Sequence, residues 1–380
     1  MSVTEHATPT LDPSELPPMD RSMRIPALRE RLGELGVDAL VVSELANVRY
    51  LSGFTGSSGM LLVGPHEALF VTDGRYATQS EQELSAAGVE AAIEVSTESP
   101  EVAIARAAEG VARLGLEADS VSWSAQRRWS SELHHGELVA TTAAVEALRL
   151  VKDPTEVARI RCACAIADEA LREVAPRLLA APTEREFALE LEAAMMRRGA
   201  DDLSFDTIVA AGPNGARPHH QPSGRPIAEG DLVVVDFGAL VDGYHSDMTR
   251  TFTVGEVGPE RTAMFDVVAE AQQAGVDAVA AGVPAAEVDL ACRELLEDAG
   301  FGEAFLHGTG HGVGLDIHEE PRVSSRSTAT LRPGHVVTVE PGVYLPEFGG
   351  VRIEDTVVVL EDGCERLTLA PKDPDPAAGR

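Results

Sequence analysis

The chain has 380 residues, an apolar fraction of 44% and a formal net charge of −31 at pH 7. This length exceeds the usual size of a single domain, so we expect two domains, with enough apolar content to bury a core. The negative charge argues against nucleic acid or an anionic membrane as a partner, because their phosphates would be repelled, and no apolar run is long enough to cross a bilayer.

The start of the chain and its cysteines indicate a cytoplasmic protein. Residues 1–20 are polar, acidic and proline-containing, and they lack the basic start and apolar stretch of a secretory signal. We therefore predict a disordered tail over residues 1–20. The cysteines show no Cys-x-x-Cys spacing, so we expect buried thiols in a reducing compartment. They are Cys162, Cys164, Cys292 and Cys364.

Residues 21–150 have the pattern of an α/β N-terminal domain. Helix and strand patterns alternate: a helix over 29–35, strands over 37–42, 60–63 and 68–71, and an Ala-rich helix over 101–114. The glycine-rich stretch 53–59 lacks the Gly-Lys-Ser/Thr ending of a phosphate-binding loop, which argues against nucleotide binding.

A second domain is predicted over residues 151–373, followed by a short tail over 374–380. It opens with Asp153-Pro154-Thr155-Glu156, which combines an N-cap acid, a proline at the first helical position and a capping-box glutamate. Thr183 opens a second helix that ends at Gly199. A strand over 206–211 follows, and then a polar loop with His219 and His220.

The same plan then repeats about a hundred residues later. Helices are predicted over 259–281 and 284–299, followed by a glycine-rich loop that contains histidines. Residues 230–238 and 334–342 are β-branched apolar runs, each opened by a glycine and closed by a carboxylate. Each is followed by a second strand-like run with another acid. We therefore predict an α+β domain of two similar halves with pseudo-two-fold symmetry and the two hairpins side by side.

The four acids of these hairpins are Asp236, Asp247, Glu340 and Glu354. If the hairpins pack edge to edge, the carboxylates converge, and without counter-charge they would repel one another strongly. Two divalent cations would remove this repulsion. His311, between glycines that allow close approach of the backbone, is a fifth candidate ligand.

This set of oxygen ligands with one imidazole suits Mn²⁺, and Co²⁺, Fe²⁺ or Zn²⁺ are alternatives. A pair of such ions activates water and polarises a carbonyl, so amide hydrolysis is the chemistry that fits best. We expect Glu340 to act as general base, and His219 and His318 to stabilise the oxyanion or donate to the leaving nitrogen.

Several neighbouring residues have more than one interpretation. Arg352 either clamps Glu354 or binds substrate. Of His219 and His220, one is expected to be exposed by chance. His307 and Asp316 are expected to be structural or to support the ligands.

The motifs resemble those of the dinuclear metallopeptidases of "pita-bread" fold, which include methionine aminopeptidases, aminopeptidase P, prolidase and the metal-free creatinases. The resemblance covers the chain beyond the tail. The matching stretches are Val-Asp-Phe-Gly at Asp236, Ser-Asp-Met-Thr-Arg-Thr at Asp247, Gly-His-Gly-Val-Gly at His311, Val-Glu-Pro-Gly at Glu340 and Val-Arg-Ile-Glu-Asp-Thr at Glu354. Residues 47–57 and 71–76 are similar to the N-terminal domain of short bacterial Xaa-Pro peptidases.

The resemblance implies that Asp247 and Glu354 bridge two ions, with Asp236 on one and with His311 and Glu340 on the other. The Pro-His loop over 213–219 resembles the family's loop, and this selects His219 over His220.

The family also implies a homodimer and cleavage of an Xaa-Pro bond at the free amino terminus of peptides, as in aminopeptidase P. Prolidase activity on Xaa-Pro dipeptides is the alternative. A non-catalytic binding protein of the same fold is a third interpretation, which the complete ligand set argues against.

Overall fold

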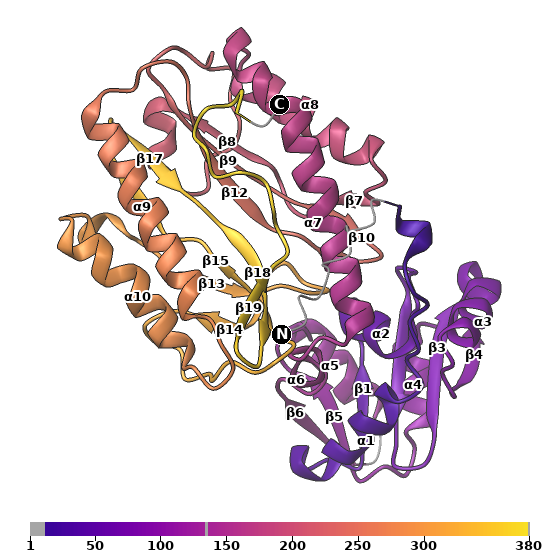
Figure 1. Ribbon diagram of the computed structural model, residues 1–380. Coiled ribbons are helices and arrows are strands. Elements are labelled where there is room, and N and C mark those ends of the chain that lie inside the picture. The colour runs from indigo at the N-terminus through magenta and orange to yellow at the C-terminus, as the bar shows by residue number, and fades with distance from the viewer. Residues whose placement is uncertain (1–11, 134–135, 379–380) are drawn as a thin grey trace, which may run out of the picture. The chain divides into compact units, whose positions relative to one another are not determined.

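The computed structural model describes residues 12–133 and 136–378, which fall into two compact units: residues 18–149, and residues 12–17 together with 150–378 (Figure 1). The first part of the predicted tail, residues 1–11, lies outside the described residues. Within the rest of that stretch, Pro13–Glu15 form a 3₁₀ turn and Met19 is buried. The domain limits predicted from sequence remain a prediction.

The smaller unit is built on one mixed six-stranded sheet in the order β4-β3-β2-β1-β5-β6. Its strands are β1 (Ala39–Val42), β2 (Gly59–Val63), β3 (Ala68–Asp73), β4 (Ala92–Ser96), β5 (Arg113–Glu117) and β6 (Glu137–Thr141). Its helices are α1 (Arg24–Leu35), α2 (Leu45–Ser52), α3 (Ala77–Ala86), α4 (Pro100–Ala107), α5 (Trp123–Glu132), α6 (Glu146–Arg149) and the 3₁₀ turn η2 (Gly74–Tyr76). β2 pairs antiparallel with both β1 and β3, whereas β4, β5 and β6 pair in parallel with their neighbours, so the expected α/β character is confirmed.

One predicted helix of this unit is wrong in its extent. The Ala-rich pattern over 101–114 suggested a single helix, but α4 ends at Ala107, and Arg113–Glu117 forms a central strand paired with β1. Gly110 has φ of 93°, a left-handed conformation that ends the helical path. Leu114 and Leu116 are buried in the sheet, and this tertiary burial outweighs their helix propensity.

The larger unit carries four long helices: α7 (Pro154–Val174), α8 (Glu184–Arg197), α9 (Pro259–Ala278) and α10 (Ala285–Asp298). The predicted capping box of α7 is present: the Asp153 side chain accepts from the backbone N–H of Glu156, and the Glu156 side chain accepts from the backbone N–H of Asp153. Thr183 and Glu186 form a second capping box at the start of α8. The short 3₁₀ segments are η1 (Pro13–Glu15), η3 (Ala175–Ala180), η4 (Gly212–Ala216) and η5 (Gly302–Ala304). In the described part of the chain, no helix has the length and apolar character needed to span a membrane.

The strands of this unit repeat in two groups. The first group is β7 (Asp202–Leu203), β8 (Ile208–Ala211), β9 (Leu232–Phe237), β10 (Ala239–Val241), β11 (Tyr244–His245) and β12 (Met248–Thr253). The second is β13 (Gly310–Gly312), β14 (Glu319–Val323), β15 (Val336–Val339), β16 (Gly342–Leu345), β17 (Gly349–Arg352), β18 (Asp355–Leu360) and β19 (Gly363–Arg366). They form sheets in the orders β12-β9-β8 and β14-β13-β15-β18-β19, with small sheets β11-β10-β7 and β16-β17.

The duplication expected from the sequence is confirmed by this arrangement. β9 pairs antiparallel with β12, and β15 pairs antiparallel with β18, each through a smaller intervening hairpin. The two halves meet where β12 lies against the segment that joins β17 to β18. There the backbone N–H of Glu354 donates to the carbonyl of Thr249 (3.1 Å), and the Thr251 hydroxyl donates to the carbonyl of Arg352 (2.8 Å).

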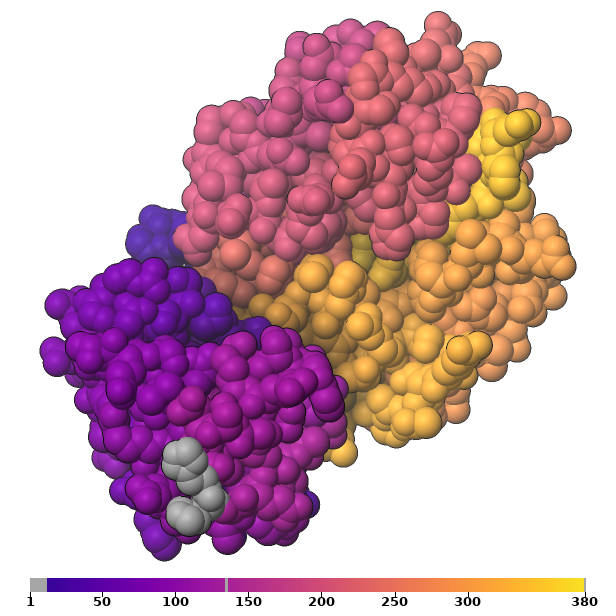
Figure 2. Space-filling view, turned by 180° about the vertical axis from the view of Figure 1, so that it is seen from behind, coloured from indigo at the N-terminus to yellow at the C-terminus, as the bar shows by residue number. Residues whose placement is uncertain are grey.

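Each half buries one face of its hairpin under its own pair of helices (Figure 1). Val233, Val235 and Phe237 of β9 belong to a core with residues of α7 and α8. Val337 and Val339 of β15 belong to a second core with residues of α9 and α10. Figure 2 shows the two halves as separate regions of the surface, pink to salmon and orange to yellow. The strand faces turned away from these cores are therefore available to form a site between the halves.

Candidate metal centre

The four expected acids lie at equivalent positions in the two halves. Asp236 is on β9 and faces away from the core that contains Val235, while Asp247 directly precedes β12. Glu340 directly follows β15 and Glu354 directly precedes β18. The ends of the paired strands thus carry the acids to the seam between the halves, and the parity of β9 accounts for the direction of Asp236.

His311 completes the group from the middle of β13. Ligand atoms of Asp247, His311 and Glu354 lie within 4.8 Å of one another. His311 Nε2 is 3.3 Å from Glu340 Oε1 and 3.5 Å from Asp247 Oδ2. Asp236 lines the same cavity as these four residues. The structure therefore brings together all five residues that the sequence singled out as ligands.

The imidazole of His311 is oriented by its own backbone. Nδ1 lies 3.0 Å from the carbonyl oxygen of Gly312. Because a carbonyl only accepts, Nδ1 carries a proton, and Nε2 is the ring nitrogen that faces the acids. The backbone N–H of His311 also donates to the Thr338 hydroxyl (3.1 Å), which anchors the strand. A metal-binding histidine needs this arrangement, in which the protein holds one ring nitrogen and the other faces the remaining ligands.

The electrostatics of the acids indicate a missing positive charge. Burial raises the pKa of Asp247 well above its ordinary value, and the charge of nearby Glu354 adds to the rise. Burial likewise raises the pKa of Glu354, with a further contribution from Glu340. Among the described residues, the buried oxygens Asp236 Oδ1 and Glu354 Oε1 accept no hydrogen bond. Orphaned carboxylate oxygens of this kind suit a divalent cation, so the residues present fit a metal site.

Arg352 has a different partner from the one expected. Its Nη2 lies 2.5 Å from Asp236 Oδ2 in a buried ion pair, so it does not clamp Glu354 directly, and the side chain lines the cavity in which a substrate would bind. Its Nε donates to the Thr249 hydroxyl (3.0 Å), which in turn donates to Glu354 Oε2 (2.7 Å). Arg352 thus orients one acid directly and reaches another only through Thr249. The register of the neighbouring strands, which no local pattern reveals, decides this pairing.

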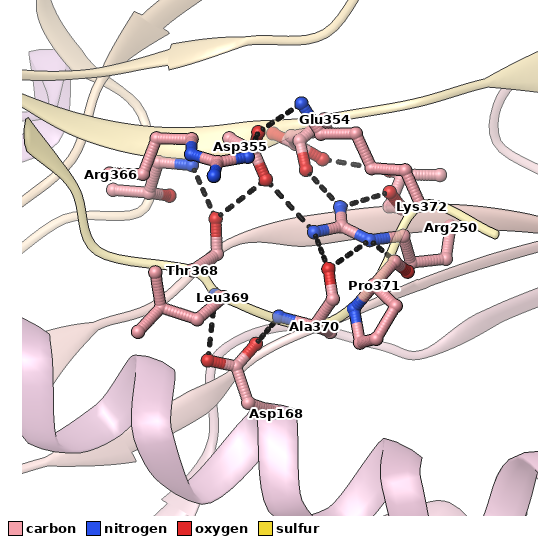
Figure 3. A network of polar contacts seen from close by, with 12 residues as sticks. Asp168, Arg250, Glu354, Asp355, Arg366, Thr368, Leu369, Ala370, Pro371 and Lys372 are labelled. Atoms are coloured by element: carbon pink, nitrogen blue, oxygen red, sulfur yellow. Dashed lines mark hydrogen bonds and ion pairs between the residues drawn. The ribbon is translucent and has the colours of Figure 1, made fainter. Parts of the chain in front are cut away.

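A second arginine supports the backbone at Glu354 (Figure 3). Arg250 donates to the carbonyl of Glu354, to the Asp355 carboxylate (2.9 Å) and to the carbonyl of Ala370 (2.7 Å). Asp355 is fully buried and also forms an ion pair with Lys372 (2.7 Å). The strand that carries Glu354 is therefore fixed from behind by a charged network that ties it to residues 367–372.

The centre lies in a cavity of about 620 Å³. His219 and His318 are exposed residues that line it, as expected for side chains that contact a substrate. The rings of His311 and His318 are 4.4 Å apart, edge to face. Burial, together with the charge of His311, lowers the pKa of His318 to about 4, so His318 is neutral at physiological pH.

Three further residues depart from or match their expectations. His220 is buried and not exposed by chance, and its Nε2 lies 2.9 Å from the buried carboxylate of Glu184. His307 supports the site, because its Nε2 is 2.8 Å from the Tyr344 hydroxyl, which also accepts from Arg352. Asp316 lies at the surface.

Sequence reasoning missed several supporting residues. Thr338 accepts from the backbone of His311 and donates to Glu340 Oε1 (3.2 Å). Its position two residues before Glu340 on one strand is a pattern that could have revealed it. The same parity places Thr249 on the face of Asp247. Tyr344 and Glu184 act across long sequence separations, and no local pattern marks them.

Comparisons with known proteins agree with this geometry. Residues 158–361 match the model of metallopeptidase family M24, and residues 24–151 match the creatinase/prolidase N-terminal domain. The chain is 40% identical to the uncharacterized peptidase YqhT of Bacillus subtilis over 92% of this chain and 99% of the relative.

Two solved structures are similar over nearly their whole length. The Xaa-Pro dipeptidase from Bacillus anthracis has a TM-score of 0.87 and 37% identity, covering 93% of this chain and 98% of that one. The X-Pro aminopeptidase from Thermotoga maritima has a TM-score of 0.83 and 36% identity, covering 91% and 98%. The expected pita-bread architecture with an N-terminal domain is confirmed.

Proposed function

Because this chain belongs to metallopeptidase family M24, we propose that it hydrolyses the Xaa-Pro bond at the free amino terminus of peptides, in the manner of aminopeptidase P. The observation that carries the proposal is the convergence of four acids and His311 in one cavity. The substrate class is taken from similar proteins, which include both an X-Pro aminopeptidase and an Xaa-Pro dipeptidase. Xaa-Pro dipeptidase activity is therefore the alternative.

We propose that Asp236, Asp247, His311, Glu340 and Glu354 hold two divalent ions per subunit. Mn²⁺ suits the oxygen-rich set best, and Co²⁺, Fe²⁺ or Zn²⁺ are alternatives. Such ions supply Lewis-acid activation of water and of the scissile carbonyl. Thr249 and Arg352 restrict the orientations of Glu354 and Asp236, so less ordering is required when ions bind.

The chain's own groups supply the proton transfers in this proposal. Glu340 lies beside His311 and accepts from Thr338, and its carboxylate opens onto the cavity as general base. His219 and His318 line the same cavity and would donate hydrogen bonds to the developing oxyanion or to the leaving proline nitrogen. A neutral His318 has a ring N–H for this purpose without adding positive charge beside the ions.

The proposal is tested with purified protein, added Mn²⁺, and the peptides Ala-Pro and Ala-Pro-Ala. Release of alanine from the tripeptide supports the aminopeptidase function, and turnover of the dipeptide alone supports the Xaa-Pro dipeptidase alternative. No turnover of either peptide by protein with measured Mn²⁺ occupancy would overturn both in favour of a binding role. We also propose that the protein is cytoplasmic and forms a homodimer. Size-exclusion chromatography with light scattering tests the homodimer.

A further inference from the structure

Another buried carboxylate lies outside the metal centre, at the first residue of α8. Glu184 is completely buried, yet it forms no ion pair with arginine or lysine among the described residues. Five hydrogen bonds instead converge on it. Its donors are Ala211 N (2.9 Å), Asn214 Nδ2 (2.9 Å), His220 Nε2 (2.9 Å), Ser223 N (3.0 Å) and Ser223 Oγ (2.6 Å).

All five donors come from one segment, residues 211–223, which begins at the last residue of β8. Ala211 and Asn214 lie near its start, and His220 and Ser223 lie near its end. The single carboxylate therefore ties the two ends of the loop to the same point on α8. Backbone bonds add to this attachment, because the N–H of Glu184 donates to the carbonyl of Arg225 (3.1 Å).

Between these two attachments the loop reaches the cavity. Pro218 and His219 line it, and the carbonyl of Pro218 accepts from Arg352 Nη1 (3.3 Å). His219 directly precedes His220, which also lines the cavity and whose Nε2 is bonded to the buried carboxylate of Glu184. Fixing the ring of His220 in the interior therefore fixes the backbone from which His219 projects into the cavity.

The hydrogen bonds compensate the burial of this charge. Burial raises the pKa of Glu184, but the donors, led by Ser223 and Ala211, outweigh it and leave the pKa below its ordinary value. A carboxylate that accepts only, and is surrounded only by donors, has no satisfactory neutral substitute. The arrangement is thus specific for glutamate.

We infer that Glu184, acting with His220, is a positioning residue that holds the loop 211–223 so that His219 meets the substrate. The inference rests on the proposed function, in which His219 contacts the substrate. It concerns the loop and not the metal ligands, because none of the five donors is one of the proposed ligands. Loss of Glu184 should therefore slow turnover without weakening metal binding.

The test is Glu184→Gln. The glutamine amide group presents a donor where the carboxylate accepted, so at least one N–H of the loop loses its partner. We expect kcat for Ala-Pro or Ala-Pro-Ala to fall at least tenfold, KM to change less than threefold, and Mn²⁺ stoichiometry and affinity to stay at the wild-type values. Hydrogen exchange of residues 211–223 should become faster.

The matched control is Glu186→Gln, in the same turn of α8. Glu186 accepts from the Thr183 backbone and hydroxyl (2.8 and 2.9 Å) and, among the described residues, forms no hydrogen bond or ion pair with the loop, so its loss should lower thermal stability only. If Glu184→Gln fails to fold, His220→Ala and His220→Gln replace it. Glutamine retains a donor for Glu184, so it should recover most of the kcat that alanine loses.

The outcomes separate the two proposals. A wild-type protein that hydrolyses neither peptide refutes the proposed function, whereas faster loop exchange in Glu184→Gln would still support the positioning role. An active wild type whose Glu184→Gln and His220→Ala variants keep both kcat and loop exchange unchanged refutes the inference. Loss of Mn²⁺ binding in Glu184→Gln would also refute it, because the residue would then support the whole centre.

Discussion

Replacing Gly310 by alanine should damage the metal centre through one steric contact. Gly310 precedes His311 in β13, and a Cβ added there would lie 2.0 Å from the carbonyl oxygen of Thr338 and 2.8 Å from its hydroxyl. Real Cβ atoms essentially never approach another heavy atom within 3.0 Å, so β13 must move by about 1 Å relative to β15. The obstacle is backbone, and it cannot be relieved by a rotamer change.

The movement affects two ligands at once. The backbone N–H of His311 donates a hydrogen bond to the Thr338 hydroxyl, and the backbone N–H of Glu340 donates to the carbonyl of Thr309 (2.7 Å) across the same strands. Their side chains are 3.3 Å apart, so a shift of about 1 Å is a large fraction of their spacing. Overpacking of this kind costs roughly 1–3 kcal/mol, and a misplacement of about 1 Å lowers a catalysed rate by roughly 100-fold. We expect at least one Mn²⁺ to bind about tenfold more weakly.

The assay is calorimetric titration of metal-free protein with Mn²⁺, together with thermal unfolding and peptide hydrolysis. The control is Gly33→Ala in α1, where an added Cβ has no neighbour within 4 Å and helix propensity should raise stability by roughly 0.5–1 kcal/mol. A Gly310→Ala variant that binds two Mn²⁺ with wild-type affinity and retains full activity would refute the steric reasoning.

Three further changes test other parts of the structure. Asp247→Ala should abolish binding of two ions and activity while the fold is kept, as elemental analysis and circular dichroism would show. His219→Ala should lower kcat more than it raises KM, and an unchanged kcat would remove His219 from the mechanism. Burial raises the pKa of Asp168 from 3.8 to about 6, so the folded state holds the proton more tightly than the unfolded state. The unfolding free energy is therefore highest below pH 4 and falls as the pH rises through 6. Relative to Asp168→Asn, wild-type stability should therefore fall by about 3 kcal/mol at most between pH 4 and pH 7, and a pH-independent difference in unfolding free energy would contradict this.

The parts of the site that were predicted depend on short-range regularities. Asp236 and Glu340 each close a β-branched apolar run that predicts a strand. Alternation of side chains along the strand sets the direction of Asp236, and the repeat of the pattern locates Glu340. His311 was found because the surrounding glycines mark close backbone approach, and Gly310 indeed has no room for a Cβ.

The parts that were missed depend on contacts between distant segments. His220 is held by Glu184, which is 36 residues earlier and has the sequence appearance of an ordinary acid at a helix start. Arg352 pairs with Asp236 across the seam between the halves, 116 residues away, instead of with its neighbour Glu354. Only the packing of segments that are distant in the sequence determines such partners.

The division of the ligands between the halves makes the site depend on both of them. One half provides Asp236 and Asp247, and the other provides His311, Glu340 and Glu354. A polypeptide with only one half would present two carboxylates, too few to enclose a pair of cations, unless it associated with a second copy about a two-fold axis. A centre with all five ligands can therefore form only when both halves are folded and in contact, so metal binding would couple the folding of one half to that of the other.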